Sequence, residues 1–446
     1  MNSEPKRNPL ALRCNDPAAL LLALLCLFAL MGAWNYAGSM PGIDYYVAWV
    51  AADATDSDTE HELYSREGQY RLGREYRSIA LSEYPDTRRA EAARFVSYLH
   101  ASATPFLYSV IGLLAGGDYD RDLSNWTALS LAGFVLAVLL IGEVLGLSVT
   151  TRLALLLACL AWMMPLHSDL RVGNVNGFQA GLVAIIFWLL SRRGDLRAVF
   201  AAGVLAAMLV LFKPNLAPIP IVLLGAWLLR GQFRRLLGGA AGMAVGTLVA
   251  LAWSSIRFGG PGIWLDWWRS LQALVVQDIP SGRGNFNAGD VLGLQLSAGS
   301  QAGVALVLCA VALALLWWGR RARPAGNPER RERAEYGLLL GAACLIQVLV
   351  SPLVWPHYFL LAVPMLIAVL RPWPEPGAGA GALLLLRDRL LPLLALLLLL
   401  DGPLRDLLAD EPVLAANRAC VVSMIVLLAV GLLQLRFPPA ARAETR

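Results

Sequence analysis

The sequence predicts an all-α polytopic membrane protein, and three observations support this prediction. Of the 446 residues, 57% are hydrophobic and 15% are charged, whereas soluble domains carry about 25% charged residues. The mean hydropathy is +0.58, and apolar segments run from one end of the chain to the other. Backbone groups in a bilayer have no water to bond, so these segments must be helices. We therefore expect residues 1–446 to form a single transmembrane domain.

The apolar segments divide into candidate helices, of which we expect about 11 to 13 to be membrane helices. They cover residues 17–37, 103–116, 124–142, 152–166, 176–191, 198–212, 216–229, 236–256, 301–318, 337–354, 358–370, 389–402 and 419–436. Several fall short of the roughly 17–25 residues of a usual spanning helix, so we expect some to be tilted, broken or re-entrant. The first follows a basic N-terminus, as a signal peptide does, but its length favours a retained helix.

Arginine clusters predict which loops face the cytoplasm. All but two of the 37 basic residues are arginines, and most stand in short groups between apolar segments, as in cytoplasmic loops, so we expect no nucleic-acid partner. The groups lie at residues 192–197, 230–235, 320–333, 371–389 and 436–442. They predict a multi-pass protein of the inner or plasma membrane with both termini in the cytoplasm. Four candidates separate the loop after the first helix, which should be external, from the 192–197 group, where an odd number is required, so one of them should not cross.

Two long segments, residues 38–102 and 257–300, are predicted to be external loops, each with an interfacial helix. In the first, the residues expected to face lipid are Leu63, Tyr64, Tyr70, Tyr76, Ile79 and Ala80. In the second, the residues suited to the headgroup layer are Trp264, Trp267, Trp268, Leu271 and Leu274. A solvated loop is the alternative for each. Two helices lying on one outer surface predict a functional site there.

Asp44 is the candidate general base. It follows the first predicted helix and has apolar and aromatic neighbours, so its carboxylate should be partly desolvated and its pKa raised. Such a carboxylate could accept a proton from a substrate hydroxyl. The alternative is that Asp44 caps a short helix over residues 45–52, because Asp is favoured at that position.

Three further stretches hold polar residues between apolar segments. A polar break at residues 165–176 carries Arg171, Asn174 and Asn176, which could bond phosphate or sugar if the break lines a cavity; an ordinary loop is the alternative. Lys213 stands between two apolar segments and suits a phosphate, unless it snorkels to the headgroups. His357 lies in an aromatic, proline-containing turn and could donate to a phosphate or shuttle a proton.

Other motifs predict little chemistry. Asp56-Ser57-Asp58 and Asp118-Tyr119-Asp120 have the spacing of metal ligands, but the first lies in a polar loop and the side of the second is uncertain. The six cysteines occur singly, which disfavours a disulfide framework or a zinc site. We expect no metal site and no cofactor.

Taken together, these stretches resemble glycosyltransferase family 87, whose members are membrane enzymes of the GT-C class. The matching motifs follow one another between about residues 38 and 370. They are Gly42-Ile43-Asp44-Tyr45-Tyr46, Leu63-Tyr64, Thr104-Pro105-Phe106-Leu107, Gly173-Asn174-Val175-Asn176, Phe212-Lys213-Pro214 and Ser351-Pro352-Leu353-Val354-Trp355-Pro356-His357-Tyr358.

The resemblance implies a GT-C-like helical bundle and a polyprenyl-phosphate sugar donor, commonly of mannose or arabinofuranose. The acceptor would be a glycan or glycolipid at the external face, reached among membrane lipids. Asp44 corresponds to the family's general base and His357 to its histidine turn. The chain departs from the family in the acidic loop between Asp53 and Glu62, and in having no second acid after Asp44, so a metal is not implied.

The predicted reaction is an inverting single displacement. Asp44 would take the acceptor proton, while Lys213, Arg171 and His357 would stabilise the leaving phosphate. The residues predicted to contact substrate are Tyr45, Tyr46, Asn174, Asn176, Trp355 and Tyr358. The alternatives are a secondary transporter or lipid-carrier flippase, for which paired broken helices in two halves are expected, and a polymer ligase.

Overall fold

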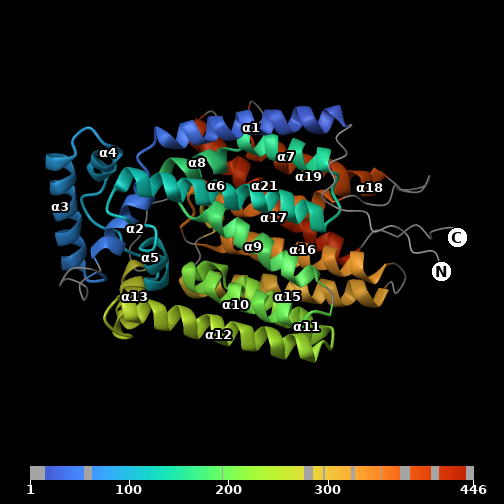
Figure 1. Cartoon of the computed structure of the whole chain (residues 1–446). Helices are drawn as coiled ribbons and strands as arrows, with labels where there is room; N and C mark the ends of the chain where they lie inside the picture. The colour runs from blue at the N-terminus through green and yellow to red at the C-terminus, as the bar shows by residue number, and fades with distance from the viewer. Residues whose placement is uncertain are drawn as a thin grey trace.

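The computed structural model describes residues 16–54, 63–192, 194–275, 285–294, 297–322, 327–351, 353–371, 382–402 and 411–437 (Figure 1). These parts of the chain are helical, and within them the sole β-type pairing is an isolated bridge between Met163 and Leu400. The predicted all-α fold is therefore confirmed.

Six helices are long and apolar enough to cross a bilayer, and a bent pair makes up to seven. The six are α1 (Pro17–Gly38), α6 (Tyr119–Val144), α12 (Phe233–Arg257), α15 (Ala298–Ala322), α16 (Pro328–Val350) and α21 (Pro412–Arg436). The bent pair is α8 (Met164–Val172) and α9 (Asn176–Ser191), whose axes differ by 116°. These helices confirm a polytopic membrane protein.

Shorter helices, most of them apolar, complete the bundle, as the short sequence segments predict. They are α7 (Val149–Trp162), α10 (Leu196–Phe212), η3 (Pro214–Leu216), α11 (Pro218–Leu229), η4 (Pro356–Ala362), α17 (Val363–Leu370), α18 (Ala382–Leu385), η5 (Leu386–Leu390) and α19 (Leu391–Leu399). Prolines begin several of them, because the ring fixes φ for a first helical turn and needs no backbone donor there. The 3-10 helix η4 runs directly into α17, so one continuous element follows Trp355.

The candidate at 103–116 does not cross the membrane. The helix there, α5 (Pro105–Ile111), has seven residues and is therefore about 10 Å long. The Thr104 hydroxyl caps it by accepting a hydrogen bond from Leu107 N–H, and also donates to the carbonyl of Leu211 at 2.6 Å. Removing α5 leaves three segments between the first predicted external loop and residue 192, an odd number, which resolves the conflict in the arginine pattern.

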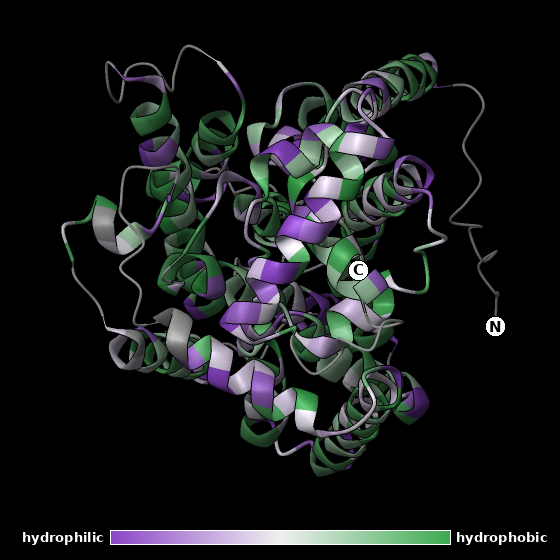
Figure 2. Ribbon diagram, turned by 90° about the vertical axis from the view of Figure 1, so that its left-hand side faces the viewer, coloured by the Kyte–Doolittle hydropathy of each residue, from purple (hydrophilic) through white to green (hydrophobic). Residues whose placement is uncertain are grey.

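A group of helices covers one end of the bundle, and we call it the cap. It comprises α2 (Ile43–Asp53), α3 (Arg66–Glu83), α4 (Arg88–Phe95), α5 and α13 (Gly262–Val275). The short α14 (Ala288–Val291) lies, like α13, in the segment 257–300 that was predicted to be an external loop. The cap stands at the left of Figure 1, while the start of α1 and the end of α21 lie toward the other end. Figure 2 looks onto the cap and shows hydrophilic residues on the helices nearest the viewer.

The cap has its own hydrophobic core, separate from the core of the bundle. Leu63, Tyr64 and Ala80 are buried in it, so the prediction that they face lipid is wrong. The apolar side of α3 packs on protein because α4 and the following loop cover it. In α13, Trp267 is buried while Trp268 is 51% exposed, so this helix keeps one apolar side free, as an interfacial helix requires.

Close helix packing sets the geometry at the junction of cap and bundle. A Cβ on Gly177 in α9 would lie 2.8 Å from the Ser130 carbonyl oxygen of α6, and a Cβ on Gly181 would lie 2.7 Å from the Cα of Gly133. Small residues of this kind let two membrane helices approach closely. The start of α9 is thereby held against α6, next to the turn that carries Asn174.

Candidate functional site

Asp44 lies in the first turn of α2, at the junction of the cap and the bundle. The N-cap of α2 is Gly42, and no side chain caps this helix, so the alternative role of Asp44 as an N-cap is wrong. The N-terminus of a helix favours a negative charge. The Asp44 side chain is 40% exposed, which leaves its carboxylate accessible to a substrate.

Asp44 faces two of the other predicted site residues. Its Oδ2 accepts a hydrogen bond from Asn174 Nδ2 at 2.6 Å and lies 3.7 Å from His357 Nε2. These partners are 130 and 313 positions away in the sequence, and the fold brings them together. His357 is 4% exposed, and its ring meets the Tyr358 ring edge-on at 4.9 Å.

Two glycines make this approach possible. Gly42 and Gly173 both have φ of +67°, a left-handed conformation that side chains other than glycine adopt at a cost. A Cβ on Gly173 would lie 2.8 Å from Tyr45 Cβ and 3.5 Å from Gly42 Cα. The two glycine turns therefore pack backbone against backbone, which places Asp44 beside Asn174.

A hydrogen-bond network leads from Asn174 into the bundle. Asn176 Nδ2 donates to Asn174 Oδ1 at 3.1 Å and to Asp169 Oδ1 at 2.9 Å. Asp169 Oδ2 also accepts from Gly177 N–H at 3.2 Å. The Asn176 Oδ1 accepts a hydrogen bond from Lys213 Nζ at 3.2 Å. The Asn176 side chain therefore links the Lys213 ammonium to the turn that carries Asn174.

Lys213 points into the site. It follows α10, and its Nζ lies 4.0 Å from the centre of the Tyr358 ring in addition to its bond to Asn176. An ammonium over an aromatic face is held by the ring's quadrupole. The side chain is therefore engaged between α9 and η4, and the alternative of snorkelling to the headgroups is wrong.

Burial shifts the pKa values of both charged groups at the centre of the site. It raises the pKa of the Asp44 carboxyl, an effect that the hydrogen bond from Asn174 and the charges of Lys213 and Arg171 oppose. It lowers the pKa of Lys213 to about 8, and the carboxylates of Asp169 and Asp44 counteract this shift. Shifts of this kind suit proton transfer and charge stabilisation near neutral pH.

The remaining predicted residues differ in exposure. Arg171, at the C-terminal end of α8, is exposed and near enough for its charge to act on Asp44. Trp355 and Tyr358 are half-buried beside His357, and the Tyr358 ring faces Lys213. Asn176, by contrast, has no exposed surface, which assigns it to positioning Lys213 and contradicts its predicted substrate contact.

Tyr45 and Tyr46 also differ from the prediction. Each is 1% exposed, and both rings pack against Tyr119, with centroid separations of 5.9 and 5.6 Å. Residues at adjacent positions of a helix point in different directions, and here both directions lie inside the cap. The structure therefore gives these rings a packing role in place of the predicted substrate contact.

Asp169 is a site residue that the sequence analysis missed. It lies within the polar break, but its neighbours in sequence do not distinguish it from Arg171 or Asn174. The available signal was an acidic residue between two apolar segments, since a buried ionisable group in a membrane protein is a functional candidate. At 1% exposure, Asp169 is closed to a substrate, which leaves Asp44 as the accessible carboxylate of the two.

The structure describes one of the two D-x-D motifs. Asp56-Ser57-Asp58 lies outside the described residues. In the second motif, Asp118 caps α6 by accepting from the backbone N–H groups of Asp120 and Arg121, and Asp120 is paired with Arg88 at 3.0 Å. Both carboxylates of the second motif are thus used in the structure of the cap.

The arrangement combines one accessible carboxylate with cations from separate elements. Asp44 can accept a proton, and Lys213 and Arg171 can stabilise negative charge close by. Such preorganised charges act most strongly where water is partly excluded. The chemistry that fits is a displacement in which a hydroxyl loses a proton and an anionic group leaves.

Comparison with known proteins identifies a family. The model of glycosyltransferase family 87 matches residues 104–352, which is more than half of the 446 residues. No curated protein and no solved structure matches the chain. The matched range includes Asn174 and Lys213, whereas Asp44 and His357 lie on either side of it.

Proposed function

The chain belongs to glycosyltransferase family 87, and from this premise we propose that it transfers a sugar from a polyprenyl-phosphate donor to a glycan or glycolipid acceptor outside the cytoplasm. It is a membrane glycosyltransferase by its family and its apolar helices. The donor, the acceptor and the side of the membrane are the proposed part.

One observation carries the proposal more than any other. Asp44 and His357 come from opposite ends of the sequence, yet their side chains lie 3.7 Å apart. Lys213 reaches the same place through Asn176 and Tyr358. A base and a cation gathered where a polar cap meets an apolar bundle suit a substrate whose phosphate lies at headgroup depth and whose chain lies in lipid.

In the proposed reaction, Asp44 accepts the proton of the acceptor hydroxyl as that oxygen attacks the anomeric carbon. A new C–O bond forms, and the bond from the anomeric carbon to the donor phosphate breaks. The leaving polyprenyl phosphate gains a negative charge, which Lys213 and Arg171 stabilise, and His357 contributes a hydrogen bond to it. A single displacement inverts the anomeric centre.

The surrounding residues would orient the substrates. Trp355 and Tyr358 have partly open rings beside His357, and aromatic faces are suited to packing against sugars and apolar chains. Asn174 holds Asp44 at 2.6 Å, so it would fix the direction in which the base points. We place this face outside the cytoplasm because the arginine-rich loops lie at the other end.

A transporter or flippase would have broken helices in both halves of the chain. Among the described helices, one pair, α8 and α9, is bent by more than 40° at a short break. No specific observation in the described residues therefore favours transport. The transfer assay described below distinguishes a transporter from a transferase. The assay also distinguishes the transferase from a polymer ligase, because a ligase would not release one sugar-free polyprenyl phosphate for each linkage formed.

The test is transfer by the purified full chain from a panel of polyprenyl-phosphate mannose and arabinofuranose donors. Asp44→Asn removes the base but keeps the shape, so kcat should fall by about 10²–10⁴-fold. Asp266→Asn is the matched control, because Asp266 lies in the cap and its side chain is also 40% exposed. Retained turnover in Asp44→Asn would remove Asp44 as the base, and no transfer with any donor by the native chain would refute the donor class.

A further inference from the structure

A second polar site lies at the end of the bundle opposite Asp44. A cavity of about 260 Å³ is found there between α11 and α15. It is lined by Leu229, Arg230, Leu316, Trp317, Arg320 and Arg321. Helix α16 connects the two ends, since it begins beside this cavity and ends at Val350, just before the turn that holds His357. Its 23 residues span about 34 Å, the thickness of a bilayer's apolar core.

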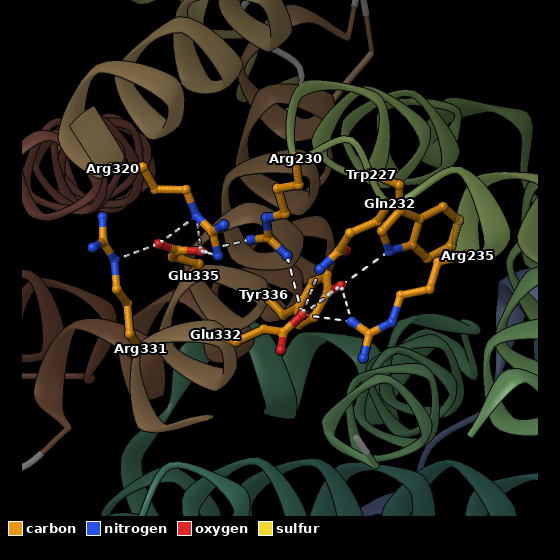
Figure 3. Close-up of polar contacts among 9 residues, drawn as sticks. All are labelled: Trp227, Arg230, Gln232, Arg235, Arg320, Arg331, Glu332, Glu335 and Tyr336. Carbon is orange, nitrogen blue, oxygen red and sulfur yellow. Dashed lines mark hydrogen bonds and ion pairs between the residues drawn. The ribbon is translucent and has the colours of Figure 1, made fainter. Parts of the chain in front are cut away.

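Arginines surround the available carboxylates in this region (Figure 3). Glu335 accepts hydrogen bonds from Arg230 at 2.7 Å, from Arg320 at 2.7 Å and from Arg331 at 2.9 Å. Glu332 is bonded to Arg235 and lies 3.6 Å from Arg230 Nη1. Because Glu335 is shared by three guanidinium groups, it cannot neutralise all of them.

The buried arginine of the cavity has donors to spare. The Arg230 side chain is 1% exposed, and neither its Nε nor its Nη1 has a hydrogen-bond partner in the described part of the chain. A buried guanidinium normally has its N–H groups satisfied. Arg230 therefore adds positive charge to the wall of the cavity, and an anion such as a phosphate suits such a wall.

Two exposed apolar side chains line the cavity beside the arginines. Leu229 and Trp317 line it and are 43% and 42% exposed. Arg321 lies 3.7 Å from the Trp317 ring and is itself exposed, so a cation stands directly beside the apolar surface. A soluble phosphate has no apolar group to pack against this surface, whereas the acyl chains of a lipid would pack along it.

From these observations we propose that this cavity binds the phosphate headgroup of an anionic phospholipid, in the leaflet opposite the one that holds Asp44. Arg320 and Arg321 contact the phosphate, the charge of the buried Arg230 lies behind them, and Leu229 and Trp317 contact the start of the acyl chains. Basic pockets between membrane helices are suited to such headgroups. The site is independent of the sugar-transfer chemistry proposed above.

The test measures lipid retention by the full chain, purified and delipidated in detergent. Phosphatidylglycerol and phosphatidylcholine are titrated separately, and bound lipid is counted by native mass spectrometry. The native chain should bind one phosphatidylglycerol in preference to phosphatidylcholine, and Arg321→Gln should weaken that binding about fivefold. Arg197→Gln is the control, because Arg197 is an exposed arginine at the start of α10 that does not line the cavity.

A second variant protects the test against a folding defect. Leu229→Glu places a negative charge on an exposed lining residue and should abolish the preference, because the new carboxylate repels the phosphate and competes with it for the arginines. Equal loss in Arg321→Gln and Arg197→Gln would overturn the site, as would equal binding of the two lipids by the native chain. Stabilisation of the native chain by inorganic phosphate equal to that by phosphatidylglycerol would overturn the lipid as its ligand.

Discussion

Replacing Lys213 with methionine removes the ammonium from the candidate site while keeping an unbranched apolar side chain of similar length. In the native chain, Lys213 Nζ donates to Asn176 Oδ1 at 3.2 Å and lies 4.0 Å from the Tyr358 ring centre. The variant leaves a buried carbonyl oxygen of Asn176 without this donor, but it also removes a desolvated charge. These effects oppose each other, so we expect Lys213→Met to fold.

The expected loss of activity follows from the charge on the leaving group. A polyprenyl-phosphate sugar is a phosphodiester with one negative charge, and the phosphate that leaves carries nearly two. A cation therefore interacts more strongly with the transition state than with the bound donor, and kcat should fall. A hydrogen bond to a charged group is worth about 1.5–3 kcal/mol, which corresponds to about a 10–150-fold decrease in kcat/KM.

The pH profile gives an independent measurement. Burial lowers the pKa of Lys213 to about 8, so the cation is lost as the pH rises through that value and transfer by the native chain should decline there. On the acid side, transfer should decline as Asp44, whose pKa is raised, becomes protonated. Lys213→Met should lose the alkaline decline near pH 8 and keep the acid one.

The assay is transfer in detergent or nanodiscs with donor and acceptor varied separately. Arg269→Gln is the control, since Arg269 is a 67% exposed cation of the cap paired with Asp266. The reasoning is refuted if Lys213→Met keeps the alkaline decline and its kinetic constants match those of Arg269→Gln.

Two predictions concern stability. Gly173→Ala should destabilise the chain by more than the roughly 1–2 kcal/mol of a left-handed residue, because its Cβ would lie 2.8 Å from Tyr45 Cβ. Gly146 has φ +81° and nothing within 4 Å of an added Cβ, so Gly146→Ala should lose only the stability that the left-handed conformation costs. Equal losses of stability in the two variants, measured by thermal unfolding, would contradict the close contact at Gly173. Glu335→Gln should cost about 3–5 kcal/mol because it removes the carboxylate bonded to the buried Arg230. The control is Glu143→Gln, because Glu143 is 43% exposed and pairs with Arg152 at the surface; its loss should cost about 0–1 kcal/mol. Similar melting temperatures for the Glu335→Gln and Glu143→Gln variants would refute the predicted difference.

Much of the fold was predictable from sequence, because hydropathy is a local property. Each apolar segment must be helical in a bilayer whatever its neighbours are, and the described chain is helical accordingly. The segment at 103–116 shows the limit of this argument. Its composition resembles that of the other segments, but Thr104 and Pro105 begin a helix of seven residues that belongs to the cap.

The candidate site was predictable in part. Asp44, Lys213 and His357 could be selected because each is an ionisable residue in an apolar setting, where burial of a charge is costly. The roles of Tyr45, Tyr46 and Asn176 could not be assigned in this way. A residue type does not say whether a side chain faces a cavity or a neighbouring helix, and the structure buries all three.

The sequence by itself determined that this chain is a helical membrane protein and which polar residues are candidates, because both follow from the free energy of placing each residue type in lipid. Only the tertiary structure decided that Asp44 lies 3.7 Å from His357, that Asp169 joins the network through Asn176, and that arginines line a cavity at the other end of the bundle. Those arrangements depend on helix packing between positions far apart in the chain, about which a local pattern carries no information.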